Sequence, residues 1–288
     1  MILILPISAS AIDADSLGMD AGALTEKIVR LVNGNQDPNL GIVEICAEDV
    51  DFSKAYRIYI DTDTDTLRLP TNNIDEIRKA LEKDLASPFV RIPIPLKNNT
   101  VEIELRKGYF LEEKVKDYYS EDEISEMRER GEWDISSYTV YDQLENPFTD
   151  YYEIVARETG ITDRELLFVT NLPVLTGTVA LVPDDEGNVV KMVPIDTWFR
   201  ESDAPDFLSY LPGSPPNPDG QWTIEYGESI RTFISGLDYS DVKKAINDAR
   251  AFSGLGVRGM ITILIVAAVL ILVVIILVLR ARRGLRRK

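Results

Sequence analysis

Residues 260–279 form an uninterrupted apolar run, MITILIVAAVLILVVIILVL, which contains no charge and no proline. Twenty helical residues at about 1.5 Å each span roughly 30 Å, which is the thickness of a bilayer core. A helix pairs all of its backbone polar groups within one segment, as a lipid environment requires. The run therefore predicts one transmembrane helix and disfavours a buried core helix.

The residues on either side of this run predict its orientation. Residues 240–259 contain four basic side chains, whereas the nine residues 280–288 contain six. Basic residues accumulate on the cytoplasmic side of a span, and moving six charges across 100 mV costs about 14 kcal/mol at about 2.3 per charge. We expect the N-terminal part outside and the tail inside, the tail being defined by Arg280, Arg282, Arg283, Arg286, Arg287 and Lys288.

Composition restricts the chemistry of the chain. It carries 31 basic and 48 acidic residues, a net charge of −17, even though the tail is basic. An acidic surface repels nucleic acid, so we expect nucleic acid or anionic lipid to meet the tail and not the ectodomain. The absence of histidine removes Ser-His-Asp and Cys-His nucleophilic sites, and there is no P-loop. We therefore expect neither enzyme activity nor a cofactor.

Cys46 is the single cysteine, which excludes an internal disulfide. It ends the stretch GIVEIC (41–46), so we expect a small apolar residue on a buried strand. Residues 2–7 are a short apolar stretch with a proline and no basic residues before it. This stretch favours a first β-strand, with a truncated signal peptide as the alternative.

The rest of the chain alternates between short helical and strand patterns. Apolar residues recur at helical spacing in 23–34 and 72–85, and Asn73 and Glu76 have the spacing of a capping box. Residues 120–131 predict a short, mostly solvated helix that Ser120 caps and Gly131 ends. Period-two alternation predicts strands at 41–46, 55–60, 89–96 and 101–107, and a hairpin at 179–193 with its turn at Asp184–Asn188. The two prolines in 89–96 predict an edge strand.

These patterns give an α+β or β-rich ectodomain with many short strands and a few amphipathic helices, followed by one C-terminal transmembrane helix. We divide the chain into an acidic mixed α/β ectodomain core (1–210), a Pro/Gly linker (211–221), a membrane-proximal strand and helical stalk (222–259), the span (260–279) and the inner tail (280–288).

Two local patterns suggest surface sites. Asp61, Asp63 and Asp65 in DTDTDT have the opening spacing of a calcium loop, but Thr66 and Asn72 replace the glycine and the glutamate that such a loop needs. The alternative to this weak calcium site is a solvated turn at a strand end. Asn98 begins the sequon NNT in a predicted turn, where glycosylation of an exported domain and an unmodified turn are both open.

Two other stretches match known motifs, but the sequence around each does not fit the function of that motif. The stretch EIVARETGITDREL (153–166) has the opening spacing of a helix-turn-helix, but the apolar LLFVTNLP follows, so we expect a helical hairpin packed on the core. The stretch GLGVRG (254–259) fits G-x-G-x-x-G, but it follows a helical pattern and precedes the apolar run. It predicts a flexible joint and not a nucleotide site.

Three hypotheses for function follow. The first is a membrane-anchored structural protein, in its sharpest form a virion coat protein on an internal membrane, with the bilayer and other copies or coat proteins as partners. The second is a prokaryotic cell-surface binding or adhesion protein with a C-terminal anchor. The third is a membrane-anchored hydrolase that uses carboxylates, although 48 acidic residues make any chosen pair uninformative.

Overall fold

The computed structural model describes residues 14, 17–36, 44–84, 86–108, 131–144, 147–172, 177–195, 208, 211–216, 223–248 and 250. The predicted strand 2–7, almost all of the predicted helix 120–131, the GLGVRG joint, the apolar run 260–279 and the tail 280–288 lie outside these residues. Within them, no helix is both long enough and apolar enough to cross a bilayer.

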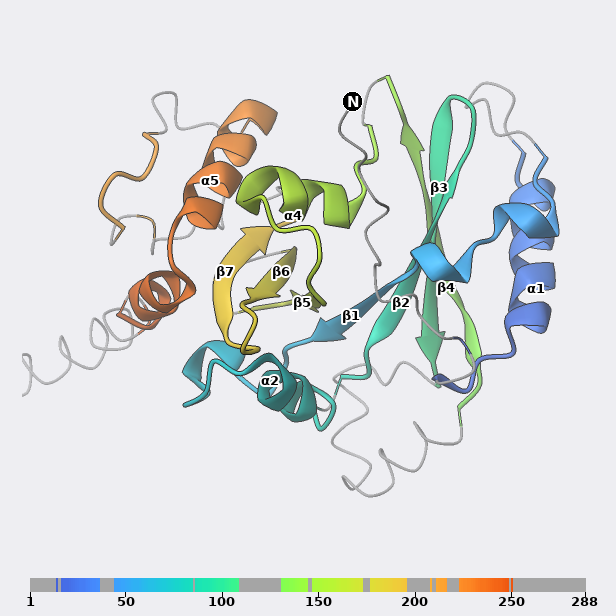
Figure 1. Cartoon of the computed structure of the whole chain (residues 1–288). Coiled ribbons are helices and arrows are strands. Elements are labelled where there is room, and N and C mark those ends of the chain that lie inside the picture. Colours follow the sequence, from blue (N-terminus) through green and yellow to red (C-terminus); the bar gives the residue numbers. More distant parts are fainter. Residues whose placement is uncertain are drawn as a thin grey trace, which may run out of the picture.

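A seven-stranded mixed sheet organises the described residues (Figure 1). Neighbouring strands are antiparallel except for β1 and β5, which run parallel and pair Ile58 with Phe168. This sheet and its helices confirm the α+β, β-rich class. In spatial order the strands are β4 (Trp133–Asp142), β3 (Asn99–Lys107), β2 (Phe89–Pro95), β1 (Tyr56–Ile60), β5 (Leu167–Thr170), β6 (Thr178–Pro183) and β7 (Val189–Pro194).

Side-chain caps fix where the helices begin. Asn73 accepts hydrogen bonds from the backbone nitrogens of Asp75 and Glu76, which is the N-cap half of the predicted capping box, whereas its own nitrogen donates to Thr71 Oγ1 and not to Glu76. Asp20 and Asp150 are the N-caps of two other helices. A further helical segment covers residues 239–248. The named helices are α1 (Ala21–Gly34), α2 (Ile74–Leu81), α4 (Tyr151–Thr159) and α5 (Ile224–Gly236), with 3₁₀ turns η2 (Ala47–Asp49), η3 (Phe52–Lys54) and η4 (Thr66–Arg68).

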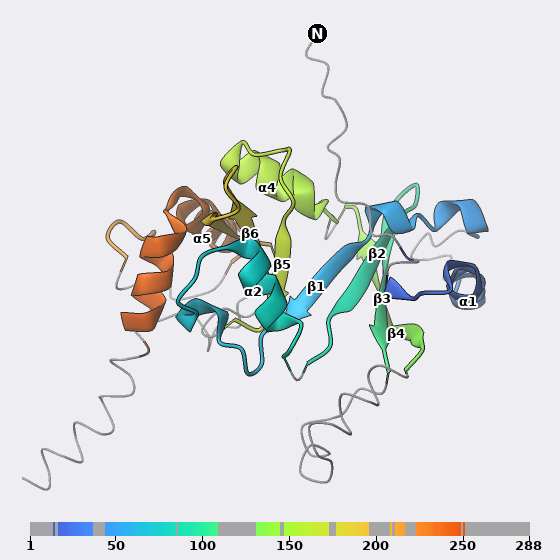
Figure 2. The same cartoon turned by 60° about the horizontal axis from the view of Figure 1, so that its bottom comes forward.

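The helices cover the two halves of the sheet differently (Figures 1 and 2). At the β5–β7 end, α2, α5 and residues 239–248 pack on one face, and α4 packs on the other. Every residue of β6 is buried, as expected for a strand covered on both faces. At the β2–β4 end, α1 covers one face with Leu24, Ile28 and Val32.

The other face of β2 and β3 carries ion pairs in place of an apolar layer. Arg91 lies 3.5 Å from a carboxylate oxygen of Glu102 and 3.6 Å from one of Glu104, and Arg106 lies 2.7 Å from Glu104. Arg91 and Arg106 also lie over the ring of Phe89. The strict alternation of apolar and charged residues in β3 therefore reflects two chemically different faces.

Several predicted elements are confirmed. The helix at 23–34, the strands at 55–60 and 101–107, and the β6–β7 hairpin are all present, and Leu181 pairs with Met192 across that hairpin. The backbone nitrogen of Asp184 donates to the carbonyl of Asn188 at 2.8 Å, which closes the turn at the predicted position.

Other predictions were wrong, each for a physical reason. The strand β2 is interior, since it pairs with β1 on one side and with β3 on the other. Its prolines are tolerated because β1 pairs only with Phe89–Arg91, so no described strand needs a hydrogen bond from Pro93 or Pro95 on that side. The apolar segment after α4 is not the second helix of a hairpin. Gly160 ends α4 with a φ of 73°, and Leu167–Thr170 then joins the sheet as β5.

Two further corrections concern residues 44–46 and the start of α5. Cys46 is exposed, since its backbone nitrogen and its thiol both donate to Asp49 Oδ2, at 2.7 and 3.1 Å, and the chain turns there. The strand predicted around QWTIEY is helical from Ile224, because Thr223 accepts a hydrogen bond from the nitrogen of Tyr226 and caps α5.

Candidate functional site

The candidate site lies where the parallel strands β1 and β5 end. The backbone nitrogen of Asp61 donates to the carbonyl of Thr170 at 3.0 Å, and Asn171 Nδ2 donates to the carbonyl of Asp61 at 3.0 Å. Asn171 and Asp65 are the two non-glycine residues with positive φ among the described residues, at 62° and 50°. Because ligands commonly bind at the carboxyl ends of parallel strands, this end of the sheet is where a functional site is expected.

Two carboxylates turn inward and hold the DTDTDT loop from within. Asp61 accepts hydrogen bonds from the backbone nitrogens of Asp65 and Thr66, both at 2.8 Å. Asp84 Oδ2 accepts three more, from Thr62 at 3.0 Å and from Asp63 and Thr64 at 2.9 Å. The backbone donors of the loop are therefore taken up by side chains of the same protein, in the manner of an internally filled anion nest.

The pKa values of the two buried carboxyls shift in opposite directions. Burial raises the pKa of Asp61 above its ordinary value, although the hydrogen bonds from Thr66 and Asp65 partly oppose this. Burial acts in the same direction on Asp84, but hydrogen bonds from Ala86, Thr64 and Asp63 outweigh it and lower the pKa of that carboxyl. Burial and the charge of Asp61 raise the pKa of Tyr239.

The third aspartate of the loop pairs with Arg250, which lies just after the helix formed by residues 239–248. Asp65 accepts two hydrogen bonds from Arg250, at 2.8 Å from Nη1 and 3.1 Å from Nη2, and Arg68 Nε lies 3.5 Å away. This two-pronged ion pair offsets part of the cost of the positive φ at Asp65. Asp63 is exposed.

The predicted calcium ligands are therefore used separately. Asp61 points into its own loop, Asp65 binds Arg250, and Asp63 faces solvent. Within the described part of the chain, no group of three or more histidine, cysteine, aspartate or glutamate side chains is arranged to hold a metal ion. The geometry favours the turn that was the alternative to a calcium site.

Three polar side chains at helical spacing fasten residues 239–250 to the connection between β1 and α2, and we call them the latch: Lys243, Asn247 and Arg250. Lys243 Nζ donates to the carbonyls of Leu69 and Thr71 and to Asn72 Oδ1, at 2.9, 3.0 and 2.9 Å. Asn247 Nδ2 donates to the carbonyl of Leu67 at 2.7 Å. The spacing i, i+4, i+7 puts all three on one helical face.

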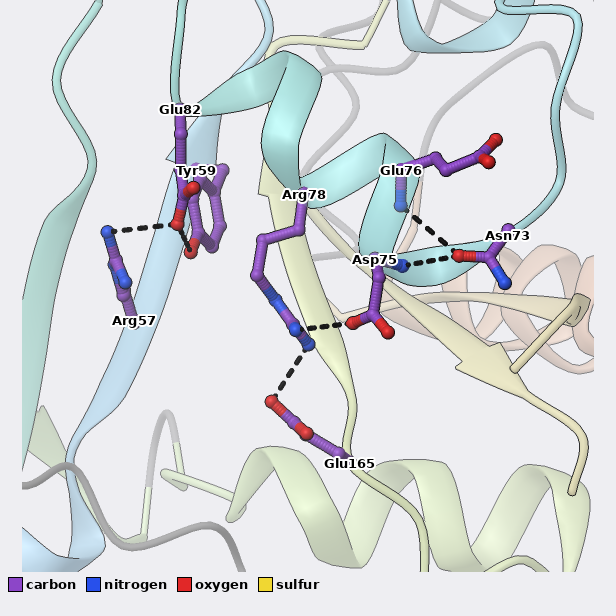
Figure 3. A network of polar contacts seen from close by, with 8 residues as sticks. All are labelled: Arg57, Tyr59, Asn73, Asp75, Glu76, Arg78, Glu82 and Glu165. Atoms are coloured by element: carbon purple, nitrogen blue, oxygen red, sulfur yellow. Dashed lines mark hydrogen bonds and ion pairs between the residues drawn. The ribbon is translucent and has the colours of Figure 1, made fainter. Parts of the chain in front are cut away.

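A second polar network fastens α2 to the sheet (Figure 3). Arg78 donates to Asp75 and to Glu165, both at 2.8 Å, and so joins α2 to the segment before β5. Tyr59 donates to Glu82 at 3.4 Å, and Arg57 lies over the ring of Tyr59 at 4.8 Å.

This network has the features of a structural contact. Burial raises the pKa of Tyr59 to about 12, so its hydroxyl stays protonated at neutral pH and is a poor nucleophile. The ion pairs of Arg78 lie at the surface, with Asp75 and Glu165 more than half exposed, and such pairs contribute about 0.2–1 kcal/mol each.

The predicted sequon lies in an accessible turn. Asn98 is exposed in the loop between β2 and β3, where the nitrogen of Leu96 donates to the carbonyl of Asn99 at 2.7 Å. A glycan at this position would project from the end of the sheet without displacing core residues.

The sequence reading missed Asp84 and all three latch residues. The latch carries a readable signal, because Lys243, Asn247 and Arg250 repeat at helical spacing on a face next to the apolar Val242, Ala245 and Ile246. Asp84 carries no such signal, since its role depends on a loop some twenty residues earlier.

Comparison with known proteins adds no relative: no protein family, no curated protein and no solved structure matches the chain.

Proposed function

We propose that the chain is a membrane-anchored structural protein, most specifically a virion coat protein with its acidic N-terminal part outside an internal membrane and its tail inside. One observation carries this proposal. An uncharged run of twenty residues is followed by six basic residues in nine, on a chain whose net charge is −17. The bilayer and other copies of the chain are its expected partners.

The candidate site supports a mechanical role over a catalytic one. The carboxylates of the DTDTDT loop are committed to backbone nitrogens and to Arg250, which leaves no free pair among them for acid–base work. The latch ties the last described helical residues, which residues 251–259 separate from the apolar run, to the β1–α2 connection. The latch thus fastens the helix that leads toward the anchor onto the outer domain, ahead of the predicted flexible joint at 254–259.

Protease protection tests the anchoring and its orientation. The full chain is inserted into sealed vesicles or isolated in particles, and protease is added outside. We expect residues 1–259 to be degraded and a small fragment containing 260–288 to survive. The matched control replaces all six basic residues of the tail with glutamine, which should favour the reversed orientation because the four basic residues of 240–259 then form the excess. An intact N-terminal part with a clipped tail would contradict the proposal.

The tail is proposed to bind phosphate groups of nucleic acid or of anionic lipid, as well as to set orientation. Each basic residue near an anionic surface contributes about 1 kcal/mol, and each phosphate contact steepens the salt dependence. A variant with Arg286, Arg287 and Lys288 changed to Gln keeps the three residues nearest the span.

This variant separates attachment from simple anchoring. A synthetic tail peptide with the three changes should bind DNA or anionic vesicles more weakly, with a shallower salt slope, while topology in the full chain stays unchanged. If the natural peptide shows no salt-dependent binding at about 150 mM salt, the tail is an anchor only. Stronger binding to DNA than to vesicles would favour genome attachment.

A further inference from the structure

The described residues cover the edges of the two outer strands, β7 and β4, differently. Beside β7, Arg231 of α5 donates to the carbonyls of Pro194 and Ile195 at 2.9 and 2.7 Å. Lys191 reaches from β7 to the carbonyls of Gly236 and Leu237. The helix α5 thus closes the β7 edge.

The opposite outer strand has no such cover among the described residues. β4 is ten residues long and pairs with β3 along its whole length, from Trp133 with Lys107 to Asp142 with Asn99. No described strand pairs with its outer side. A β-bulge near Ile135 leaves Ser137–Asp142 as its longest regular stretch, and Ser136 through Thr139 are exposed.

The composition of this edge is unusual for a strand left open. Between Asp134 and Asp142 the sequence ISSYTVY contains no charge and no proline, and it is rich in residues that favour strands. Proteins usually protect open edges with lysine, proline or inward charges, because unpaired backbone groups recruit other strands. The two large apolar side chains that are exposed in the described part of the chain also lie here: Tyr138 is 40% exposed and Leu144, just after β4, is 92% exposed.

We propose that the outer edge of β4 is the docking surface for β4 of a second copy, paired antiparallel so that the two sheets become continuous. The inference deepens the proposed coat function, on which it rests, because a shell subunit must contact its own copies. Two chains that each carry −17 repel one another, so a stable contact between them needs an uncharged patch, and ISSYTVY is one.

Symmetry also favours a second copy as the occupant. A two-fold contact uses the same patch on both partners and must be complementary to itself. An antiparallel strand edge meets this condition, because its backbone donors and acceptors alternate in the same order in both directions. A basic or acidic peptide partner would require an opposite charge on the edge, and this stretch carries none.

A pair of lysine substitutions tests the proposal in the full chain in detergent micelles. Ser137→Lys with Thr139→Lys places like charges beside one another across the proposed pairing while both side chains remain at exposed positions of the folded subunit. The control, Ala23→Lys with Ser229→Lys, adds the same charge at exposed helical positions. Circular dichroism and thermal unfolding verify that both variants are folded.

Sedimentation across a concentration series gives the result. We expect the natural chain and the control to dimerise, and the dimer dissociation constant of the edge variant to rise about tenfold or more. An unchanged dissociation constant in the edge variant, or a monomeric natural chain, would overturn the proposal. Flotation of the same proteins with vesicles is read separately, so that failure of membrane anchoring is distinguishable from failure of the β4 contact.

Discussion

The two ends of the sheet differ in how their outer strands are finished. At the β7 end the chain returns on itself: α5 and residues 239–248 cover one face, α4 covers the other, and Arg231 binds the last carbonyls of the strand region. At the β4 end, one helix covers one face and the middle of the outer strand is exposed. In the assembly proposed above, the β7 end serves the stability of the subunit and the β4 end serves contact with a second copy.

The contrast also assigns different tasks to charged residues. At the β7 end, buried or half-buried charges such as Arg231 and Lys243 donate to backbone carbonyls and fasten one segment to another. At the β4 end, Glu102, Glu104 and Arg91 form ion pairs on one face of the sheet, and the outer edge itself is uncharged from Ile135 to Tyr141. Charged side chains therefore fasten segments together at the β7 end, whereas at the β4 end they lie on one face of the sheet and not along the outer edge.

Core truncation at the two ends gives the largest expected contrast. Ile234→Ala removes a fully buried side chain from the cluster beneath α5 and should lower the free energy of unfolding by about 2–5 kcal/mol. Tyr138→Ala at the β4 edge should change it by about 0.5 kcal/mol or less, as for other exposed positions. Thermal or denaturant unfolding of the full chain in micelles measures both, at a concentration below the dimer dissociation constant. Equal losses would show that the β4 edge is already buried in the isolated subunit.

The two inward carboxylates give the next largest effect. Asp84→Asn should lower stability by about 1–3 kcal/mol, because the loop nitrogens then bind a neutral oxygen in place of a charged one. Asp61→Asn should cost less, since burial already disfavours the charged form of Asp61 and raises its pKa.

The pH dependence of these variants has a definite sign. The pKa of Asp84 is lowered in the folded protein, so its contribution is complete above the ordinary aspartate pKa and is lost as pH falls through the lower, folded value. The stability gap between the natural chain and Asp84→Asn should therefore narrow in strong acid. The contribution of Asp61 to stability depends on pH with the opposite sign. Because its pKa is raised in the folded protein, that contribution is lost as pH rises through the folded value. A gap for Asp84→Asn that widens in acid would contradict this assignment.

The latch gives the smallest expected effect on stability. Arg250→Gln removes the two-pronged pair with Asp65 and should cost about 0.5–1 kcal/mol, less at high salt. The matched control is Arg68→Gln, which contacts the same carboxylate at 3.5 Å from a more exposed position. Limited trypsin digestion adds a sensitive readout, because a loosened helix should be cut faster after Lys244. Identical cleavage rates in both variants would show that the Arg250–Asp65 ion pair does not hold the helix in place.

Local patterns predicted the parts of this fold that are held by neighbours in sequence. Asn73 caps α2, and the Asp184–Asn188 turn closes the β6–β7 hairpin, because each depends on residues within a few positions. The interior place of β2 could not be predicted in this way, since the tolerance of Pro93 depends on how far the distant β1 extends.

The candidate site was predictable only in its location. The repeat of Asp61, Asp63 and Asp65 correctly marked a loop at the end of a strand, but spacing alone did not show that these side chains would separate. Their partners are Arg250 and backbone nitrogens of the loop, and the loop nitrogens between them bind Asp84. Because these contacts depend on the parallel pairing of β1 with β5 and on a helix nearly 200 residues away, no short pattern encodes them.

Hydrogen exchange at the two outer strands tests the central contrast most directly. The full chain in micelles is compared at concentrations below and above its dimer dissociation constant. We predict that backbone amides of Ser137–Tyr141 exchange more slowly as concentration rises, whereas those of Val189–Val193 exchange at the same rate throughout. Exchange in β4 that does not depend on concentration, or slowing confined to β7, would contradict the account.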